Sequence, residues 1–284
     1  MQALGYYNGK FGFLDDMTLP ITDRAVYYGD GVYEATPTRN HVIYAIDQHV
    51  DRMFSSASLL KIEPPFTRDW LKNELNLMME QMDGGDNVLY WQLSRGTARR
   101  AHPFPENVKP NLMMMITPYR FPNLDEYVSA ITLEDTRFLH CNIKTLNLIP
   151  SIMAMQQAKE QGCYEAVLHR NGRVTECSKS NVHILKDGCL ITAPTDNLIL
   201  PGIARSHLIE GCNANGIEVI ERPYNLGELK NADEIFITSS TSFLRRCVRL
   251  DDMEAGGRDE ARFQTLKNYV WNRFIAATEV EKDR

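Results

Sequence analysis

The chain has 284 residues, of which 43% are hydrophobic and 24% charged, and its net charge is -6. This length exceeds one typical domain, and the composition supplies enough apolar material for a core, which excludes a disordered chain. The acidic balance without a basic block argues against nucleic acid as a partner. The sequence has neither a basic-then-apolar leader nor a run of about 18 uncharged apolar residues, so we expect a cytoplasmic protein that does not enter membranes.

Cysteine and histidine spacing argues against a metal site. The cysteines lie at positions 141, 163, 177, 189, 212 and 247 and form no C-x-x-C pair. The histidines form no H-E-x-x-H pattern. We therefore expect reduced thiols and no protein-bound metal.

The N-terminal part alternates short apolar runs with turn signals. Asn8-Gly9 predicts a tight hairpin. Gly29-Asp30-Gly31 predicts a turn followed by a strand over 32–35 that carries Tyr33. A tyrosine in this position is ordinarily a core aromatic residue.

Two helices and two strands are expected next. The first helix runs from Asp47 as N-cap to about residue 61, and Arg52 lies off its apolar stripe, where a solvated charge is the common case. The second helix follows Thr67 as N-cap and buries a methionine stripe. Apolar runs predict strands over 88–95 and 111–117.

The insertion between these strands, residues 96–110, is too polar for core and too long for a hairpin. Arg99, Arg100 and His102 give it a cationic tip. The tip is either a solvated basic loop or an anion site, and a guanidinium matches a carboxylate bidentately.

Residues 120–123 predict a linker between an N-terminal domain, 1–119, and a C-terminal domain, 124–284. The later part predicts a strand pair over 127–138, a helix over 147–161 and a helix from residue 203. Hairpin turns are expected at Asn171-Gly172 and Asp187-Gly188. A strand that ends in hydroxyl residues 238–242 and a final helix over 259–278 complete the chain.

Lys144 and Glu176 are the candidate catalytic residues. Lys144 precedes an apolar helical run, and a desolvated lysine amine attacks carbonyls and forms Schiff bases. Glu176 lies at a strand end before the Ser178-Lys179-Ser180 turn and needs a cationic partner if it is buried. Taken alone, a snorkelling lysine and a solvated glutamate are the commoner cases.

Four separated motifs favour a functional role for Lys144 and Glu176 over the commoner structural one. The runs KTLNLIPS, YEAVLHRNGRVTECSKSNV, NLILPGIAR and ITSSTS occur in this order. Together they closely resemble the signature of the fold-type IV pyridoxal-phosphate aminotransferases, most closely the D-amino-acid transaminases. The resemblance implies a two-domain α+β / α/β fold, with a smaller N-terminal α+β domain and a larger C-terminal domain that has a β-barrel-like core and flanking helices.

The resemblance also implies roles for individual residues. Pyridoxal 5'-phosphate would form a Schiff base with Lys144 and pass through a pyridoxamine form, while Glu176 holds the ring nitrogen. The remaining cofactor-binding residues would be Arg52, Leu200, Ile203, Ala204, Ser240 and Thr241. The substrate carboxylate would be bound by Tyr33, Arg100 and His102, the substrates would be D-amino acids and 2-oxo acids, and the protein would be a homodimer.

Alternatives and departures remain. A branched-chain aminotransferase or an aminodeoxychorismate lyase would use the same Lys144 and Glu176, and the Arg-Ala-His tip argues against both. A non-catalytic binding protein of this fold and a hydrolase with a serine activated by Lys179 are alternatives of another class. Three positions depart from the family pattern: Ala204 replaces a usual threonine, Arg99 a usual proline, and Lys179 interrupts a serine cluster.

Overall fold

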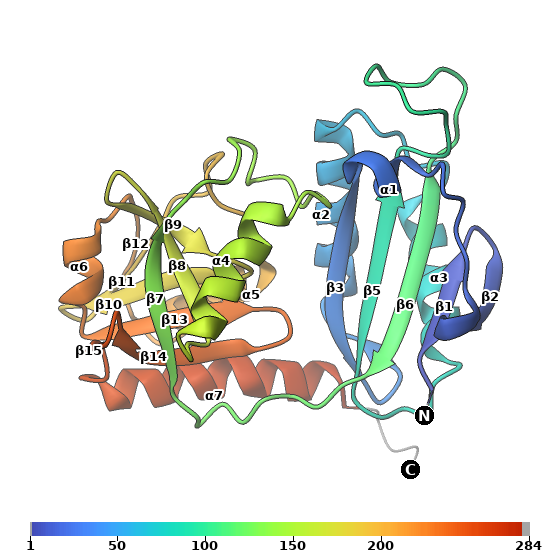
Figure 1. Cartoon of the computed structure of the whole chain (residues 1–284). Coiled ribbons are helices and arrows are strands. Elements are labelled where there is room, and N and C mark those ends of the chain that lie inside the picture. Colours follow the sequence, from blue (N-terminus) through green and yellow to red (C-terminus); the bar gives the residue numbers. More distant parts are fainter. Residues whose placement is uncertain (1, 280–284) are drawn as a thin grey trace, which may run out of the picture. The chain divides into compact units, whose positions relative to one another are not determined.

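The computed structural model describes residues 2–279 and divides into two compact units (Figure 1). The first unit comprises residues up to 121, residues 143–147 and the described residues from 274 onward, and the second comprises 122–142 and 148–273. Residues 143–147 thus group with the first unit rather than with the predicted C-terminal domain. The reason is local: the amide of Tyr33 donates to the Lys144 carbonyl at 3.0 Å, and the amide of Leu146 donates to Gly31 at 3.0 Å.

The first unit is an antiparallel sheet covered by two helices (Figure 1). Its strand order is β2-β1-β6-β5-β3-β4. Trp91, Met53 and Leu71 are fully buried in its core. The elements are β1 (Leu4–Tyr7), β2 (Lys10–Phe13), the 3-10 helix η1 (Leu14–Asp16), α1 (Arg24–Tyr28), β3 (Gly31–Arg39), β4 (Val42–Ile43), α2 (Ile46–Leu59), α3 (Arg68–Met79), β5 (Asn87–Ser94) and β6 (Asn111–Pro118).

Local sequence signals predict most of this unit. Asn8 and Gly9 both adopt positive φ in the β1–β2 turn, as an Asn-Gly hairpin requires. The Thr67 side chain caps α3 by accepting from the amide of Trp70, which confirms that prediction. The predicted cap Asp47 is wrong, because α2 already begins at residue 46, with Ala45 as its N-cap at φ 53, and Asp47 lies in the first turn.

The second unit is a mixed sheet with helices packed on it (Figure 1). Its strand order is β12-β11-β10-β13-β14-β7-β8-β9, and β15 pairs with β14. The pairs β7–β8, β7–β14 and β11–β12 are parallel. The elements are β7 (Val128–Glu134), α4 (Ile149–Glu160), β8 (Glu165–Arg170), β9 (Arg173–Cys177), β10 (Asn181–Lys186), β11 (Cys189–Thr192), α5 (Ile203–Ala214), β12 (Val219–Glu221), α6 (Leu226–Lys230), β13 (Glu234–Ser239), β14 (Phe243–Leu250), β15 (Met253–Glu254) and α7 (Glu260–Ala277).

Both predicted hairpin turns of this unit are confirmed, because Asn171-Gly172 and Asp187-Gly188 adopt positive φ between paired strands. The predicted strand pair over 127–138 is wrong, since only β7 forms there. After Glu134 the Asp135 side chain binds Arg137, as well as Arg170 of β8 and Thr175 of β9.

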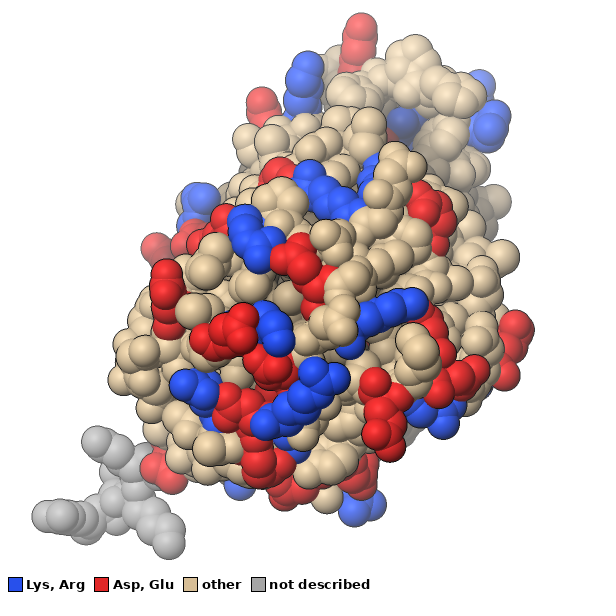
Figure 2. Space-filling model, turned by 90° about the vertical axis from the view of Figure 1, so that its left-hand side faces the viewer, with Lys and Arg blue, Asp and Glu red and all other residues tan. Residues whose placement is uncertain are grey.

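The surface carries mixed charge. On the face shown in Figure 2, lysine and arginine side chains are interspersed with aspartate and glutamate. Within residues 2–279, no helix combines the length and apolarity that a membrane crossing requires. No cluster of metal-ligating side chains occurs among the same residues.

Candidate active site

Lys144 is half-buried and is held beside an aromatic pair in the first unit. Its backbone amide donates to Ser56 Oγ at 3.2 Å, and its Nζ lies 4.1 Å from the centre of the Tyr33 ring. The Tyr33 ring in turn stacks on Tyr90, with centroids 5.5 Å apart. The amine therefore rests on a ring face, and no described carboxylate forms an ion pair with it. This arrangement leaves the Lys144 amine available as a nucleophile.

Glu176 is buried at the end of β9 in the second unit. Arg137 Nη1 donates to Oε1, and Oε2 accepts from Asn181 Nδ2 at 2.9 Å and from the Leu200 amide at 3.0 Å. Burial raises the pKa of Glu176 to about 7, although Arg137 acts to lower it. A carboxylate in this state is stabilised by one further cationic or N–H donor.

Arg137 is the cationic partner that sequence reasoning missed. It lies between Asp135 and Glu176, and its Nη2 donates to Asp135 Oδ2 at 2.9 Å. Burial alone would raise the pKa of Asp135, but Arg137 and Arg170 hold it at about 2. The sequence gives only a weak indication of this pair, because Asp135 and Arg137 are two opposite charges two residues apart that follow an apolar run.

The predicted phosphate-binding residues of the second unit lie at a helix start and a hairpin turn. Gly202 is the N-cap of α5 and offers no side chain to the first-turn amides of Ile203 and Ala204. Ser240 and Thr241 lie in the turn between β13 and β14, and their hydroxyls make no hydrogen bond to another described residue. Unpaired donors at a helix N-terminus and in a turn suit an anion.

Arg52 is not the solvated charge that its place off the apolar stripe suggests. Its side chain is only 11% exposed, and its Nε and Nη2 both donate to the Glu34 carboxylate at 2.7 Å. His49 contacts the same carboxylate at 2.7 Å. Burial alone would raise the pKa of Glu34, but Arg52 and His49 hold it at about 2. Glu34 thus fixes the orientation of Arg52, a contact that the sequence does not reveal.

The cationic tip of the loop between β5 and β6 is exposed and is organised around Tyr28. The Cζ atom of Arg100 lies 5.4 Å from the centre of the Tyr28 ring, and the centre of the His102 ring lies 5.5 Å from it. Arg24 anchors the loop, because its Nη1 donates to the Ala101 carbonyl at 2.7 Å. The structure therefore brings Arg100 and His102 together. In the described part of the chain it shows no contact between either of them and Tyr33.

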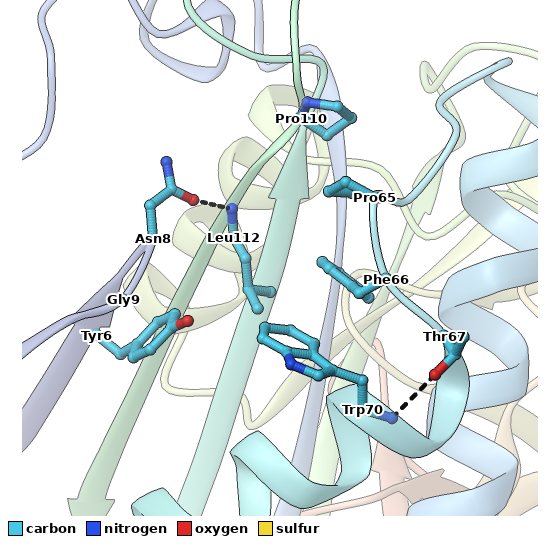
Figure 3. Close-up of a pocket in the computed structure, with 9 residues that line it drawn as sticks. All are labelled: Tyr6, Asn8, Gly9, Pro65, Phe66, Thr67, Trp70, Pro110 and Leu112. Carbon is cyan, nitrogen blue, oxygen red and sulfur yellow. Dashed lines mark hydrogen bonds between the residues drawn. The ribbon is translucent and has the colours of Figure 1, made fainter.

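A separate cavity of about 660 Å³ occupies the first unit (Figure 3). Tyr6 and Trp70 face each other across it, and Phe66 stacks on Trp70 with centroids 4.9 Å apart. None of the predicted site residues lines it. Its lining contains no lysine, cysteine, histidine or carboxylate side chain, so we do not assign the active site to it. It is lined by Tyr6, Asn8, Gly9, Pro65, Phe66, Thr67, Trp70, Pro110 and Leu112.

Comparison with known proteins identifies the class. Residues 31–250 match the amino-transferase class IV family model. The chain belongs to this family, and it is an aminotransferase that depends on pyridoxal 5'-phosphate.

Curated relatives of the chain include D-alanine aminotransferases. The chain is 35% identical to a D-alanine aminotransferase of Bacillus licheniformis over 88% of this chain and 89% of that protein. It is 37% identical to a D-alanine aminotransferase of Listeria monocytogenes serotype 4b over 93% of each.

Solved structures confirm the expected fold. The branched-chain amino acid aminotransferase of Escherichia coli superposes with a TM-score of 0.89 and covers 99% of this chain and 98% of its own, at 19% identity. The branched-chain aminotransferase of the archaeon Thermoproteus uzoniensis, solved with norvaline, gives a TM-score of 0.87 over 98% and 96%, at 21% identity.

The residues of this chain fit the cofactor. The Lys144 amine has no carboxylate partner among the described residues, which suits bonding to an aldehyde. Glu176 is a buried carboxylate whose raised pKa shows that it lacks full compensation, which suits a ring N–H donor. The unpaired hydroxyls of Ser240 and Thr241 suit a phosphate.

Proposed function

We propose that this enzyme transfers the amino group of a D-amino acid, of the D-alanine or D-glutamate type, to a 2-oxo acid. The observation that carries the proposal is the pair formed by Arg100 and His102 around Tyr28, which presents a cationic tip to solvent. The D-alanine aminotransferases to which the chain is 30% to 37% identical support the same reaction. No observation favours a branched-chain substrate, because the branched-chain structures share only the fold.

Each cofactor contact has a stated chemical purpose. When bound, pyridoxal phosphate supplies an aldehyde for amine exchange and a protonated ring that withdraws electrons from the substrate. Glu176 would accept the N–H of the ring nitrogen, and Arg137 favours the ionised form of Glu176 because it opposes the rise of its pKa. Lys144 binds the cofactor and then moves the proton at the substrate Cα.

Neutral donors and the Arg52 cation would hold the phosphate. The amides of Ile203 and Ala204 and the hydroxyls of Ser240 and Thr241 would donate to it. Leu200 would act at the ring nitrogen instead, because its amide donates to Glu176 Oε2. Arg52, oriented by Glu34, supplies the cation.

The substrate carboxylate determines which enantiomer reacts. Arg100 and His102 bind it, and Tyr33 supports it from its place beside Lys144. Fixing the carboxylate on one side directs the α-hydrogen of only one enantiomer to the Lys144 amine.

We also propose a cytoplasmic homodimer. The first unit exposes a set of large apolar side chains near its N-terminus, and the second unit exposes another set on and before α4. Exposed apolar groups of this size mark protein interfaces. The first set is Phe11, Phe13, Leu19, Ile21 and Val26, and the second is Phe138, Leu139, Ile149, Ile152 and Met153. Equilibrium sedimentation tests this, and a fully active monomer would contradict it.

Substitution of Arg100 tests the assigned function. Arg100→Ala should lower kcat/KM for D-alanine at least about 30-fold, because truncating one partner of a hydrogen-bonded charge pair costs about 2 kcal/mol or more. The same change should spare (R)-1-phenylethylamine, which carries no carboxylate. Arg99→Ala is the matched control and should change the ratio of the two substrates less. An unchanged ratio in Arg100→Ala would show that the carboxylate is bound elsewhere.

A further inference from the structure

Lys179 is an exposed lysine whose orientation is fixed by its two neighbours. The hydroxyl of Ser178 donates to Glu165, and Ser180 Oγ donates to Glu165 Oε2 at 2.8 Å. Both serines are buried, whereas Lys179 between them is exposed. The amide of Cys177 also donates to the Ser180 carbonyl at 2.7 Å, which closes the turn. Because the serine hydroxyls face inward to one carboxylate, the lysine side chain leaves the turn on the other side.

Lys179 and the Ser240–Thr241 turn lie at the same end of the paired strands β10 and β13. Asn181 at the start of β10 pairs with Thr238 of the antiparallel strand β13. Lys179 precedes this pair by two residues and Ser240 follows it by two, so both lie at the same end of the two neighbouring strands. Tyr164 joins the same region, since its hydroxyl donates to Ser242 Oγ at 2.9 Å, and the Lys179 Nζ lies 5.6 Å from the Tyr164 ring centre.

Apart from the Tyr164 ring, Lys179 has no charged partner among the described residues. No described carboxylate forms an ion pair with it. The Cζ atom of Arg245 lies 5.5 Å from the centre of the same Tyr164 ring. Its guanidinium already forms hydrogen bonds, because Nη1 donates to the Asn123 carbonyl and Nη2 to the Glu126 carbonyl, each at 3.0 Å. Lys179 is therefore a cation without an ion-pair partner that shares its Tyr164 contact with Ser242, the residue next to the unpaired hydroxyls of Ser240 and Thr241.

We propose that Lys179 is an additional phosphate-binding residue of this chain, which supplies a positive charge to the cofactor phosphate at the Ser240–Thr241 turn. A phosphate dianion attracts an ammonium more strongly than a hydroxyl does, and Lys179 offsets the hydroxyl that is missing at Ala204. This inference rests on the proposed function in one respect, because it takes the Ser240–Thr241 turn as the place where the cofactor phosphate binds.

The test measures cofactor affinity rather than turnover. Cofactor-free protein is titrated with pyridoxal phosphate and, separately, with pyridoxal, which lacks the phosphate. Lys179→Gln should raise the Kd for pyridoxal phosphate roughly three- to tenfold, as expected for an exposed charge acting on a dianion, and leave the Kd for pyridoxal unchanged. Lys179→Arg should restore tight binding. Lys186→Gln, at the other end of β10, is the matched control for loss of a lysine charge and should leave both affinities unchanged.

Two outcomes would overturn the inference. One is an equal Kd for pyridoxal phosphate in Lys179→Gln and the wild type. The other is an equal weakening for pyridoxal, which would show a structural effect instead of a phosphate contact. Failure of the wild type to transaminate any D-amino acid while it binds the cofactor would count against the proposed function and leave this comparison intact.

Discussion

The titration of Glu176 makes a quantitative prediction about folding. Burial raises its pKa from 4.5 to about 7, while Arg137 opposes the rise. Between these pH values the folded protein keeps a proton on Glu176 that the unfolded chain has lost. Because Glu176 binds more protons in the folded state in this window, its contribution to the free energy of unfolding falls as the pH rises from about 4.5 to about 7.

The size of the effect follows from the shift. Each pKa unit corresponds to about 1.4 kcal/mol, so the move from 4.5 to about 7 contributes a fall of about 3 kcal/mol. His183, whose pKa burial lowers from 6.5 to about 3, contributes with the opposite sign between these two pH values. That contribution is common to the wild type and Glu176→Gln, so it cancels in their difference.

Urea unfolding of the cofactor-free wild type and Glu176→Gln, followed by circular dichroism from about pH 4.5 to about pH 7.5, measures this difference. We expect the stability of the wild type relative to the variant to decline by about 3 kcal/mol over the range. A difference that stays constant within about 0.5 kcal/mol would refute the reasoning, because Glu176 would then ionise like an exposed carboxyl.

Two substitutions test the chemistry. Lys144→Ala should abolish the visible absorbance of the bound cofactor and all transamination while circular dichroism remains native, and an active protein that absorbs in the visible would end the assignment of Lys144. Glu176→Gln should retain the cofactor but lose on the order of 2 to 4 kcal/mol of transition-state stabilisation in single-turnover rates; rates equal to the wild type would make Glu176 purely structural.

The sequence predicts features that depend on neighbouring residues. The hairpin turns at Asn8-Gly9 and Asn171-Gly172 follow from the positive φ that these residue types tolerate, and the Thr67 cap follows from its hydroxyl. Helix α1 spans only five residues, too few for a periodic pattern, so the sequence does not predict it. The start of α2 is not predictable either, because Ala45 adopts a left-handed conformation that alanine rarely takes.

The family motifs predict the site residues themselves, whereas only the structure shows the groups that support them. Arg137 and Glu176 are 39 residues apart in sequence, and Glu34 and Arg52 are 18 apart. Nothing local marks such pairs, because both partners look like ordinary surface charges until the fold buries them. Burial and the pairing of residues far apart in sequence are therefore the features of the site that the sequence does not predict.

The central claim, that the enzyme acts on D-amino acids, is tested most directly by a half-reaction. Purified protein loaded with pyridoxal phosphate is mixed with D-alanine or L-alanine, without an acceptor, and the visible absorbance of the bound cofactor is followed. We expect D-alanine to bleach this absorbance and L-alanine to leave it unchanged. Bleaching by L-alanine alone would contradict the account and direct attention to the alternatives within the family.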